Sequence, residues 1–345
     1  ARHAPPGGAA ARESGMAVYS WIEDEELALF LADYDIGHLT AFRGIAEGVE
    51  NCNFLLRTEK AGIASAFILT LYEKRVNPDD LPWFLGFMRH LATEGLSCPL
   101  PVAGKDGNAL RMLAGRPAAI TTFLSGVWPR HVHEAHCAPL GAALARLHVA
   151  GNSYAPTRAN SLGPHAWRPL LNATQQSAGS EDAFPGLIGE LDQALSRILS
   201  DWPGTNGKKD LPHGQIHADL FPDNVFFLDG KVSGLIDFYF ACTDLLAYDV
   251  AICLNAWCFD DDGVFHAAFA QRLLEGYESI RPLSTDERGA LPILCAGAAM
   301  RFTLTRLYDW INTPAGAMVT RKNPMAYVHR LRFHLSAAGS EAYGV

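Results

Sequence analysis

The segment HADLFPDN, residues 217–224, places a histidine, two aspartates and an asparagine within eight positions. Short β-like runs lie on both sides of this segment, and a third run, LIDFYFA, carries Asp237. We expect His217 and Asp219 to end one strand and Asn224 to begin the next. The hairpin that follows returns the chain, so that Asp237 comes back toward Asn224. The sequence therefore predicts that Asp219, Asn224 and Asp237 converge on one point.

Such a convergence of carboxylate and amide oxygens suits a hard divalent cation, notably Mg²⁺ carried by nucleotide phosphates. Phosphoryl transfer also needs a carboxylate that receives the proton of the acceptor hydroxyl and aligns it with the γ-phosphate. We assign this catalytic role to Asp219 and metal ligation to Asn224 and Asp237. A single aspartate at a turn is usually a turn former. That alternative does not account for three oxygen-bearing residues at this spacing.

Two neighbours of these residues have less direct roles. His217 either braces the loop by hydrogen bonding, which is the usual role of a histidine behind such a loop, or takes part in catalysis. Asp223 is expected to belong to the turn or to the surface.

Composition narrows the class of protein. Hydrophobic residues make up 49% of the 345 positions and charged residues 19%, which is typical of a soluble globular enzyme large enough for two cores. The net charge of -9 argues against nucleic-acid binding, which needs clustered Lys and Arg. No apolar run reaches the roughly 18 residues of a membrane-spanning helix. Seven cysteines without a CxxC pair indicate reduced thiols in a cytoplasmic protein.

The pattern of elements predicts an α+β fold with two unequal lobes. Residues 1–15, rich in Ala, Gly and Pro, are expected to be a disordered extension or an artificial remnant ahead of Met16. Residues 16–124 form a nucleotide-binding lobe of antiparallel sheet with a helix over 78–95, and a hairpin turn is expected at Asp106 and Gly107. Residues 125–345 form a mostly helical lobe for catalysis and substrate binding. The stretch 151–182 is assigned no structure, and the long helices of this lobe are expected at 132–150, 183–201, 244–258, 263–278, 285–311 and 324–337.

The spacing H-x-D-x-x-x-x-N, followed by a strand-borne I-D-F, matches the catalytic loop and metal-binding Asp of protein kinases, with Ala218 in place of the usual Arg. In this form it resembles the aminoglycoside phosphotransferase and choline kinase branch of kinase-like folds. The resemblance implies a protein-kinase-like two-lobe fold, with ATP and Mg²⁺ as cofactors. Asp249 resembles the family's aspartate on the following helix, which implies structural support of the catalytic loop.

The nucleotide phosphates need a cover, and the chain has no P-loop motif. The candidate is GIAEGVENCNF, residues 44–54, in which Gly44 and Gly48 permit close backbone approach while Asn51 and Asn53 add donors. An ordinary hairpin with Gly and Asn turn chemistry explains the same residues.

The third strand departs from the kinase pattern, because Thr70 stands where kinases carry a Lys for the phosphates. Lys74 lies on the same strand face and could reach back toward the phosphates. It could equally be a solvated charge at the end of the strand.

Across Met16 to Phe333 the chain resembles the bacterial homoserine kinases built on the choline-kinase-like fold. Membership implies ATP-dependent phosphorylation of the homoserine hydroxyl, a step toward threonine, with homoserine and ATP as small-molecule partners and no nucleic acid or membrane. The oligomeric state stays open. The segments that carry the resemblance are GIAEGVENCNF, ILTLYEKRV, LPWFLGFMRHLA, CPLPV, HADLFPDNVFF, LIDFYFACTDLLAYDVAICLNAWCF and RFTLTRLYDW.

An amino-acid acceptor needs a cation for its carboxylate and an acidic or carbonyl partner for its ammonium group. Arg306 and Asp309 lie three residues apart on one helix and are our candidates, with Asn255 and Trp257 beside them and Arg301 as a second choice. The alternative is an intrahelical Arg–Asp pair with the tryptophans in the core.

Other functions stay open on the residues alone. Choline would favour an aromatic cage, for which Trp257, Tyr239, Tyr308 and Trp310 are available. Ethanolamine or an aminoglycoside are further acceptors, although the latter would need a broad acidic cleft. Because Thr70 replaces the Lys, a nucleotide-binding regulator without activity is a rival from another class. A metallohydrolase that uses His217 and Asp219 lacks a second His-rich cluster.

Overall fold

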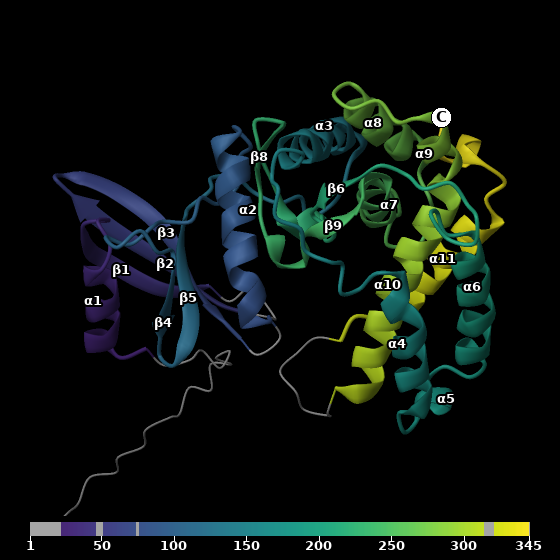
Figure 1. The fold of residues 1–345 in the computed structure, drawn as a ribbon, viewed down its shortest axis with the longest axis horizontal. Helices are drawn as coiled ribbons and strands as arrows, with labels where there is room; N and C mark the ends of the chain where they lie inside the picture. Colours follow the sequence, from purple (N-terminus) through teal and green to yellow (C-terminus); the bar gives the residue numbers. More distant parts are fainter. Residues whose placement is uncertain (1–21, 46–50, 74–75, 314–320, 345) are drawn as a thin grey trace, which may run out of the picture.

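The computed structural model describes residues 22–45, 51–73, 76–313 and 321–344. It has a small lobe built on one antiparallel sheet and a larger, mostly helical lobe (Figure 1). The predicted α+β fold class is confirmed.

The small lobe is a five-stranded antiparallel sheet in the order β1-β2-β3-β5-β4. Strand β3 is central, and its apolar residues Leu69 and Leu71 are fully buried. They pack with Leu56 of β2 and with the apolar face of α1, which includes Phe30. Because alternate residues of a strand point to opposite faces, one face of the sheet packs against α1. The elements are α1 (Asp24–Ala32), β1 (His38–Ile45), β2 (Asn51–Lys60), β3 (Ile63–Tyr72), β4 (Leu110–Leu113) and β5 (Arg116–Thr122).

The expected hairpin turn at Asp106 and Gly107 is wrong. These residues form a turn ahead of β4, in which the Gly107 N–H donates to the Gly104 carbonyl at 2.9 Å. The hairpin between β4 and β5 turns instead at Ala114 and Gly115, which have φ of 50° and 70°. The Asp-Gly pair indicates a turn correctly, but the Ala-Gly pair that follows reverses the strand.

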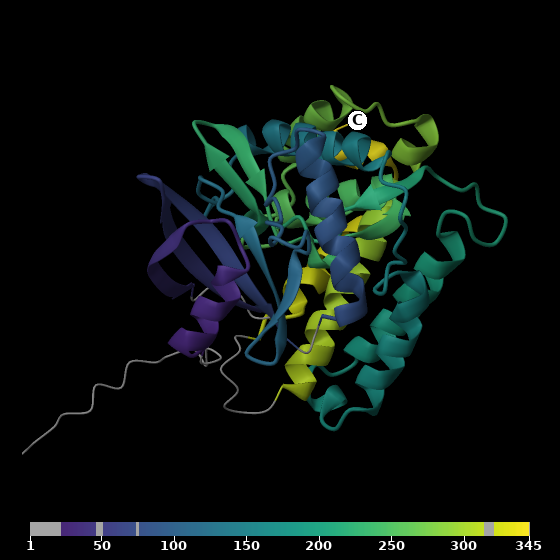
Figure 2. The same cartoon turned by 60° about the vertical axis from the view of Figure 1, so that its left-hand side comes forward.

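Helix α2 (Leu81–Thr93), preceded by the 3₁₀ turn η1 (Pro78–Asp80), lies between the sheet and the larger lobe (Figure 1, Figure 2). Its buried Phe84, Phe87 and Leu91 belong to the hydrophobic core of the larger lobe. The side chain of Asn77 accepts the Asp79 N–H and so begins this segment. The helix therefore ties the two lobes together.

The larger lobe contains eight α-helices of five or more residues within the described ranges, together with one single-turn helix. Among the described residues, none of the helices combines the length and apolar character needed to cross a membrane. The helices are α3 (Glu134–Gly151), α4 (Pro164–Gln176), α5 (Ser180–Ala183), α6 (Leu187–Asp201), α7 (Leu246–Trp257), α8 (Ala267–Glu278), α9 (Thr285–Gly289), α10 (Leu291–Asn312) and α11 (Met325–Ser336), with the final 3₁₀ turn η4 (Ser340–Tyr343).

Most of the expected helices occur, with shifted boundaries. The stretch 151–182, for which the sequence predicts no defined structure, contains α4, and its Trp167 and Leu171 are buried in the core. The expected helix 285–311 is divided at Ala290, because α9 ends there and Pro292 begins the first turn of α10. Residues 242–245 are a strand rather than the start of α7.

Two short antiparallel ribbons position the polar loop. Strand β6 (His213–Ile216) pairs with β9 (Cys242–Leu245), and β7 (Val225–Leu228) pairs with β8 (Lys231–Leu235). The 3₁₀ turn η2 (Pro222–Asn224) leads into β7, and η3 (Phe238–Phe240) leads into β9. The ribbons therefore bring the segments 217–224 and 236–241 to the same region, as the sequence predicted.

Candidate active site

A cavity of about 1540 Å³ is lined by residues of both lobes. Asn53 and Thr70 line it from the sheet, and Asp219, Asn224 and Asp237 line it from the larger lobe. A pocket for one small ligand typically measures about 300–1,000 Å³. The cavity therefore has room for a nucleotide and an acceptor together.

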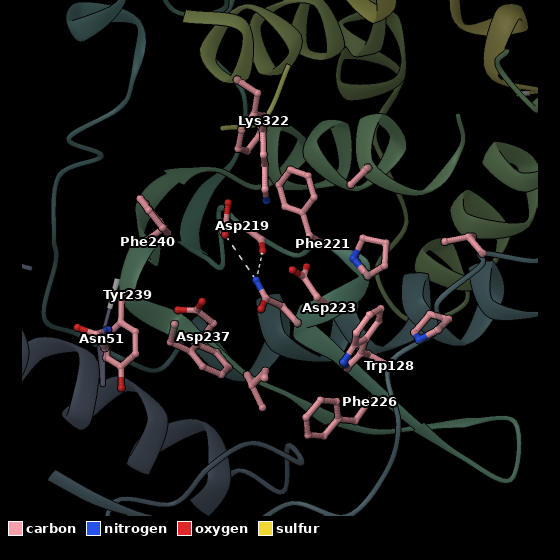
Figure 3. Close-up of a pocket in the computed structure, with 18 of the residues that line it drawn as sticks. Asn51, Trp128, Asp219, Phe221, Asp223, Phe226, Asp237, Tyr239, Phe240 and Lys322 are labelled. Atoms are coloured by element: carbon pink, nitrogen blue, oxygen red, sulfur yellow. Dashed lines mark hydrogen bonds between the residues drawn. The ribbon is translucent and has the colours of Figure 1, made fainter. Parts of the chain in front are cut away.

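The three predicted oxygen-bearing residues face this one cavity. The side-chain amide of Asn224 donates to the Asp219 carbonyl at 2.8 Å and approaches the Asp219 carboxylate at 3.5 Å. The Ile236 N–H donates to the Asn224 carbonyl at 3.0 Å, so the residue before Asp237 is bonded to Asn224. Figure 3 shows Asp219 and Asp237 around the same space, and Asp223 of the η2 turn lines it too.

Two residues of this site have a left-handed backbone. Ala218 has φ of 63°, and Asp237 has φ and ψ of 63°. For a residue with a side chain this conformation costs about 1–2 kcal/mol. Backbone strain of this kind persists only where the surroundings hold it.

The backbone at Ala218 is held from both sides. The buried Asp249 carboxylate of α7 accepts the N–H of His217 at 2.7 Å and the N–H of Ala218 at 2.9 Å. The buried Arg301 guanidinium of α10 donates to the Ala218 carbonyl at 2.5 Å. These bonds hold the peptide groups directly before Asp219 and so orient its side chain.

His217 is fully buried, and both of its ring nitrogens are hydrogen-bonded inside the fold. The Asp219 N–H donates to Nδ1 at 3.3 Å, so Nε2 carries the proton and donates to the Ile236 carbonyl at 2.9 Å. Burial lowers the pKa of His217 and favours this neutral form. Of the two roles considered, the contacts support bracing: His217 links Asp219 to Ile236, the residue directly before Asp237.

Asp249 has a further partner that sequence analysis missed. His148 of α3 donates from Nε2 to the Asp249 carboxylate at 3.1 Å, and its Nδ1 lies 2.7 Å from the Tyr277 hydroxyl. Burial alone would raise the pKa of Asp249, but the hydrogen bond and charge of His148, with the neighbouring His217, hold it below its usual value. The sequence could not predict this contact, because a single histidine in an apolar helix does not indicate which residue it will meet.

On the sheet side, the Thr70 hydroxyl donates to the Asn53 side-chain carbonyl at 2.8 Å, and the Asn51 side chain accepts the Glu73 N–H at 3.2 Å. Gly44 lies in β1 opposite Phe54. Gly48 and Lys74, two of the predicted nucleotide-binding residues, lie outside the described residues.

A hydrogen bond crosses between the lobes next to Thr70. The hydroxyls of Tyr72 in β3 and Tyr239 in η3 lie 2.9 Å apart. Tyr239 also packs edge-on against Phe84 of α2, with ring centroids 5.7 Å apart. The residue two positions after Asp237 is thereby fixed to the sheet and to α2.

Comparisons with known proteins agree with this geometry. Residues 41–283 match the model of the phosphotransferase enzyme family. A homoserine kinase of Gluconacetobacter diazotrophicus is 65% identical over 330 residues, which are 96% of this chain and 100% of that protein. A homoserine kinase of Rhodospirillum rubrum is 58% identical over 96% of this chain and 99% of its own length. The chain belongs to the phosphotransferase enzyme family. Within it, the chain belongs to the homoserine kinases, so the predicted membership is confirmed.

Solved structures support the fold of this family. An amicoumacin kinase in complex with AMP-PNP, Ca²⁺ and Ami has a TM-score of 0.67 at 17% identity, over 92% of this chain and 95% of that one. A choline kinase from Cryptosporidium parvum has a TM-score of 0.61 at 13% identity, over 90% and 94% of the two chains. The predicted kinase-like fold is therefore confirmed.

Two predicted substrate residues do not reach the cavity of this phosphotransferase. Asn255 is fully buried, with its amide nitrogen bonded to the Ala251 and Cys295 carbonyls. Trp257 is also buried, and its Nε1 donates to the Leu220 carbonyl at 2.8 Å. Both lie on α7 behind the loop and outside the lining of the cavity, so their predicted contact with substrate is not supported. Trp257 supports the backbone next to Asp219.

The other two predicted substrate residues, Arg306 and Asp309, do line the cavity. Among the described residues no ion pair joins them, so the intrahelical Arg–Asp alternative is not the arrangement found. Asp309 is exposed, and Arg306 lies over the Tyr327 ring at 4.3 Å. Arg306 is therefore available to a ligand in the cavity.

We predict that Asp249→Asn lowers the free energy of unfolding by about 2–4 kcal/mol, because an amide cannot accept all three N–H groups that meet the carboxylate. The folded pKa of Asp249 is lowered, so its contribution is present above the pH of about 4 at which an unfolded Asp ionises. It is lost as pH falls through the folded pKa. Urea unfolding of both proteins at pH 7 and below pH 4 measures this.

The matched control is Asp286→Asn, which removes an exposed carboxylate paired with Lys209. Exposed pairs contribute about 0–1 kcal/mol, so this variant should unfold like the wild type. Two results would contradict the role of the ionised carboxylate. One is equal free energies of unfolding for wild type and Asp249→Asn at pH 7, and the other is a difference between them that grows on acidification.

Proposed function

We propose that this protein transfers the γ-phosphoryl group of ATP to the side-chain hydroxyl of L-homoserine and yields O-phospho-L-homoserine, a step toward threonine. The observation that carries the proposal is that Asp219, Asn224 and Asp237 line one cavity in a chain whose relatives, matched over nearly their full length, are named homoserine kinases. Residues 16–124 and 125–345 would serve as the nucleotide-binding and catalytic lobes.

Asp219 is proposed as the base. Its carboxylate receives the proton of the acceptor hydroxyl as the oxygen forms a bond to the γ-phosphorus, and the bond from that phosphorus to the bridging oxygen breaks to release ADP. The support is its place in the cavity, on a backbone held by Asp249 and His217. These two residues would act by positioning.

Asn224 and Asp237 are proposed to hold Mg²⁺. The fit rests on the oxygen atoms that these side chains offer. The amide nitrogen of Asn224 is bonded to the Asp219 carbonyl, so the side-chain oxygen is the atom left to bind a metal ion. Asp237 adds a carboxylate, and oxygen ligands are those that Mg²⁺ prefers. Within the described ranges, no group of three or more His, Cys, Asp or Glu could hold a metal ion. When bound, Mg²⁺ neutralises charge on the β- and γ-phosphates.

On the nucleotide side we propose Asn51, Asn53 and Gly44 as phosphate contacts. Thr70 supplies a hydroxyl in place of the usual Lys, and its bond to Asn53 orients that amide. Gly48 and Lys74 remain proposed contacts of the same kind.

For the acceptor, Arg306 is the proposed partner of the carboxylate and Asp309 that of the ammonium group, because both line the cavity and carry the required charges. An aromatic choline cage has less support. Of its four candidates, Tyr239 and Tyr308 line the cavity, whereas Trp257 is buried behind the loop. The guanidinium of Arg321 already lies over the ring of Trp310, 5.1 Å from its centroid.

We also infer a cytoplasmic location. All seven cysteines are free thiols, and six of them are buried. Free thiols without disulfides suit a reducing compartment.

We expect acceptor-dependent ADP release with homoserine, and little with choline, ethanolamine or an aminoglycoside. A coupled assay with ATP and Mg²⁺ measures this directly. ADP release with another of these acceptors and none with homoserine would move the assignment to that acceptor. Nucleotide binding without ADP release from any of them would instead favour the regulator that Thr70 suggested.

Asp219→Asn is expected to lower turnover by about 10²–10⁴-fold while leaving ATP affinity nearly intact, because it removes the base but keeps the side-chain volume. Steady-state kinetics with homoserine and titration with AMP-PNP separate the two effects. Turnover close to that of the wild type would rule out Asp219 as the base.

A further inference from the structure

Two arginines of the larger lobe share one aromatic ring at the cavity wall. The guanidinium carbon of Arg306 in α10 lies 4.3 Å from the ring centroid of Tyr327, and that of Arg330 in α11 lies 4.4 Å from it. Both arginines line the cavity, and the Tyr327 side chain is fully buried. Stacking on an aromatic face fixes the orientation of a guanidinium.

Arg330 is fixed by a second contact. Its Nη1 donates to the Asn255 carbonyl of α7 at 2.6 Å. Its guanidinium also lies 5.2 Å from the Phe259 ring centroid. Because a guanidinium carries five N–H donors, this backbone contact leaves others for a ligand. The buried Asn255 thus acts on the cavity through its main chain.

Neither arginine of this pair forms an ion pair within the described residues. The larger lobe pairs many of its other arginines, such as Arg332 with Glu190. Burial and the nearby Arg330 charge lower the pKa of Arg306, while Tyr327 and Asp219 oppose this shift. Two partly desolvated cations near the proposed base call for an anionic partner.

We propose that Arg306 and Arg330, aligned on Tyr327, form the subsite that binds the carboxylate of the amino-acid acceptor and so place its side-chain hydroxyl at Asp219. The inference rests on the proposed function, and it adds Arg330 and Tyr327 to the residues that determine specificity. Two guanidiniums can donate to both oxygens of one carboxylate. Amino alcohols without a carboxylate leave both cations unneutralised and are rejected.

The test compares two acceptors in four proteins. The acceptors are homoserine and the same molecule with its carboxylate reduced to a hydroxymethyl group. The proteins are the wild type, Arg306→Met, Arg330→Met and the control Arg332→Met, which changes an arginine of the same helix that pairs with Glu190 outside the cavity. The assay is acceptor-dependent ADP release.

For Arg306→Met and Arg330→Met we expect kcat/KM for homoserine to fall about 10²-fold or more, mainly through KM. For the reduced acceptor the change in kcat/KM should stay within about threefold, because that molecule has no carboxylate for the arginines to bind. AMP-PNP affinity should be unchanged, and Arg332→Met should resemble the wild type with both acceptors.

Equal losses with both acceptors would overturn the proposal, because a structural defect or a contact to the transferred phosphate acts on either acceptor. If a methionine variant unfolds, Arg330→Lys is the replacement test, because lysine keeps the charge but lacks the planar guanidinium. The same loss of preference for homoserine over the reduced acceptor is expected. Failure of the proposed function is distinct, since the wild type would then not phosphorylate homoserine at all.

Discussion

The loop of residues 217–224 depends on one buried carboxylate. Asp249 accepts the N–H groups of His217 and Ala218, and Arg301 binds the carbonyl of Ala218 from the other side. Without these bonds, a left-handed alanine and its buried peptide groups would each carry a cost. The hydrogen bonds from Asp249 and Arg301 orient the backbone before Asp219. The backbone carbonyl of Asp219 in turn accepts a hydrogen bond from the side-chain amide of Asn224. A charge on a helix behind the loop therefore determines the geometry in front of it.

The cavity lining carries groups of both charges. It includes carboxylate and amide oxygens from the loop and from the segment after β8, together with the arginines of α10 and α11. Burial lowers the pKa of Arg306, and the negative charge of Asp219 acts against this shift. This lining suits the proposed transfer, in which the polyphosphate of the nucleotide and the carboxylate of the acceptor would each need a cationic partner.

The sequence predicted what depends on local spacing and missed what depends on packing. Asp219, Asn224 and Asp237 lie within 19 positions joined by one hairpin, so their convergence followed from strand geometry. Helix α7 is buried on all sides, and periodicity could not tell which of its residues face the loop; Asn255 and Trp257 were therefore misplaced. Arg330 was missed because only the packing of α11 against α10 brings it to the cavity. Helix α4 was missed because the apolar periodicity of this stretch is weak and Pro169 lies inside the helix.

The most direct test of the phosphoryl-transfer site is a crystal structure with Mg²⁺, AMP-PNP and homoserine. We expect the Asn224 side-chain oxygen and an Asp237 carboxylate oxygen at about 2.0–2.1 Å from a magnesium ion that also contacts the phosphates. The homoserine hydroxyl should then lie within hydrogen-bonding distance of the Asp219 carboxylate, about 2.6–3.2 Å. A metal ion bound away from both ligands, or an acceptor hydroxyl directed away from Asp219, would contradict the site.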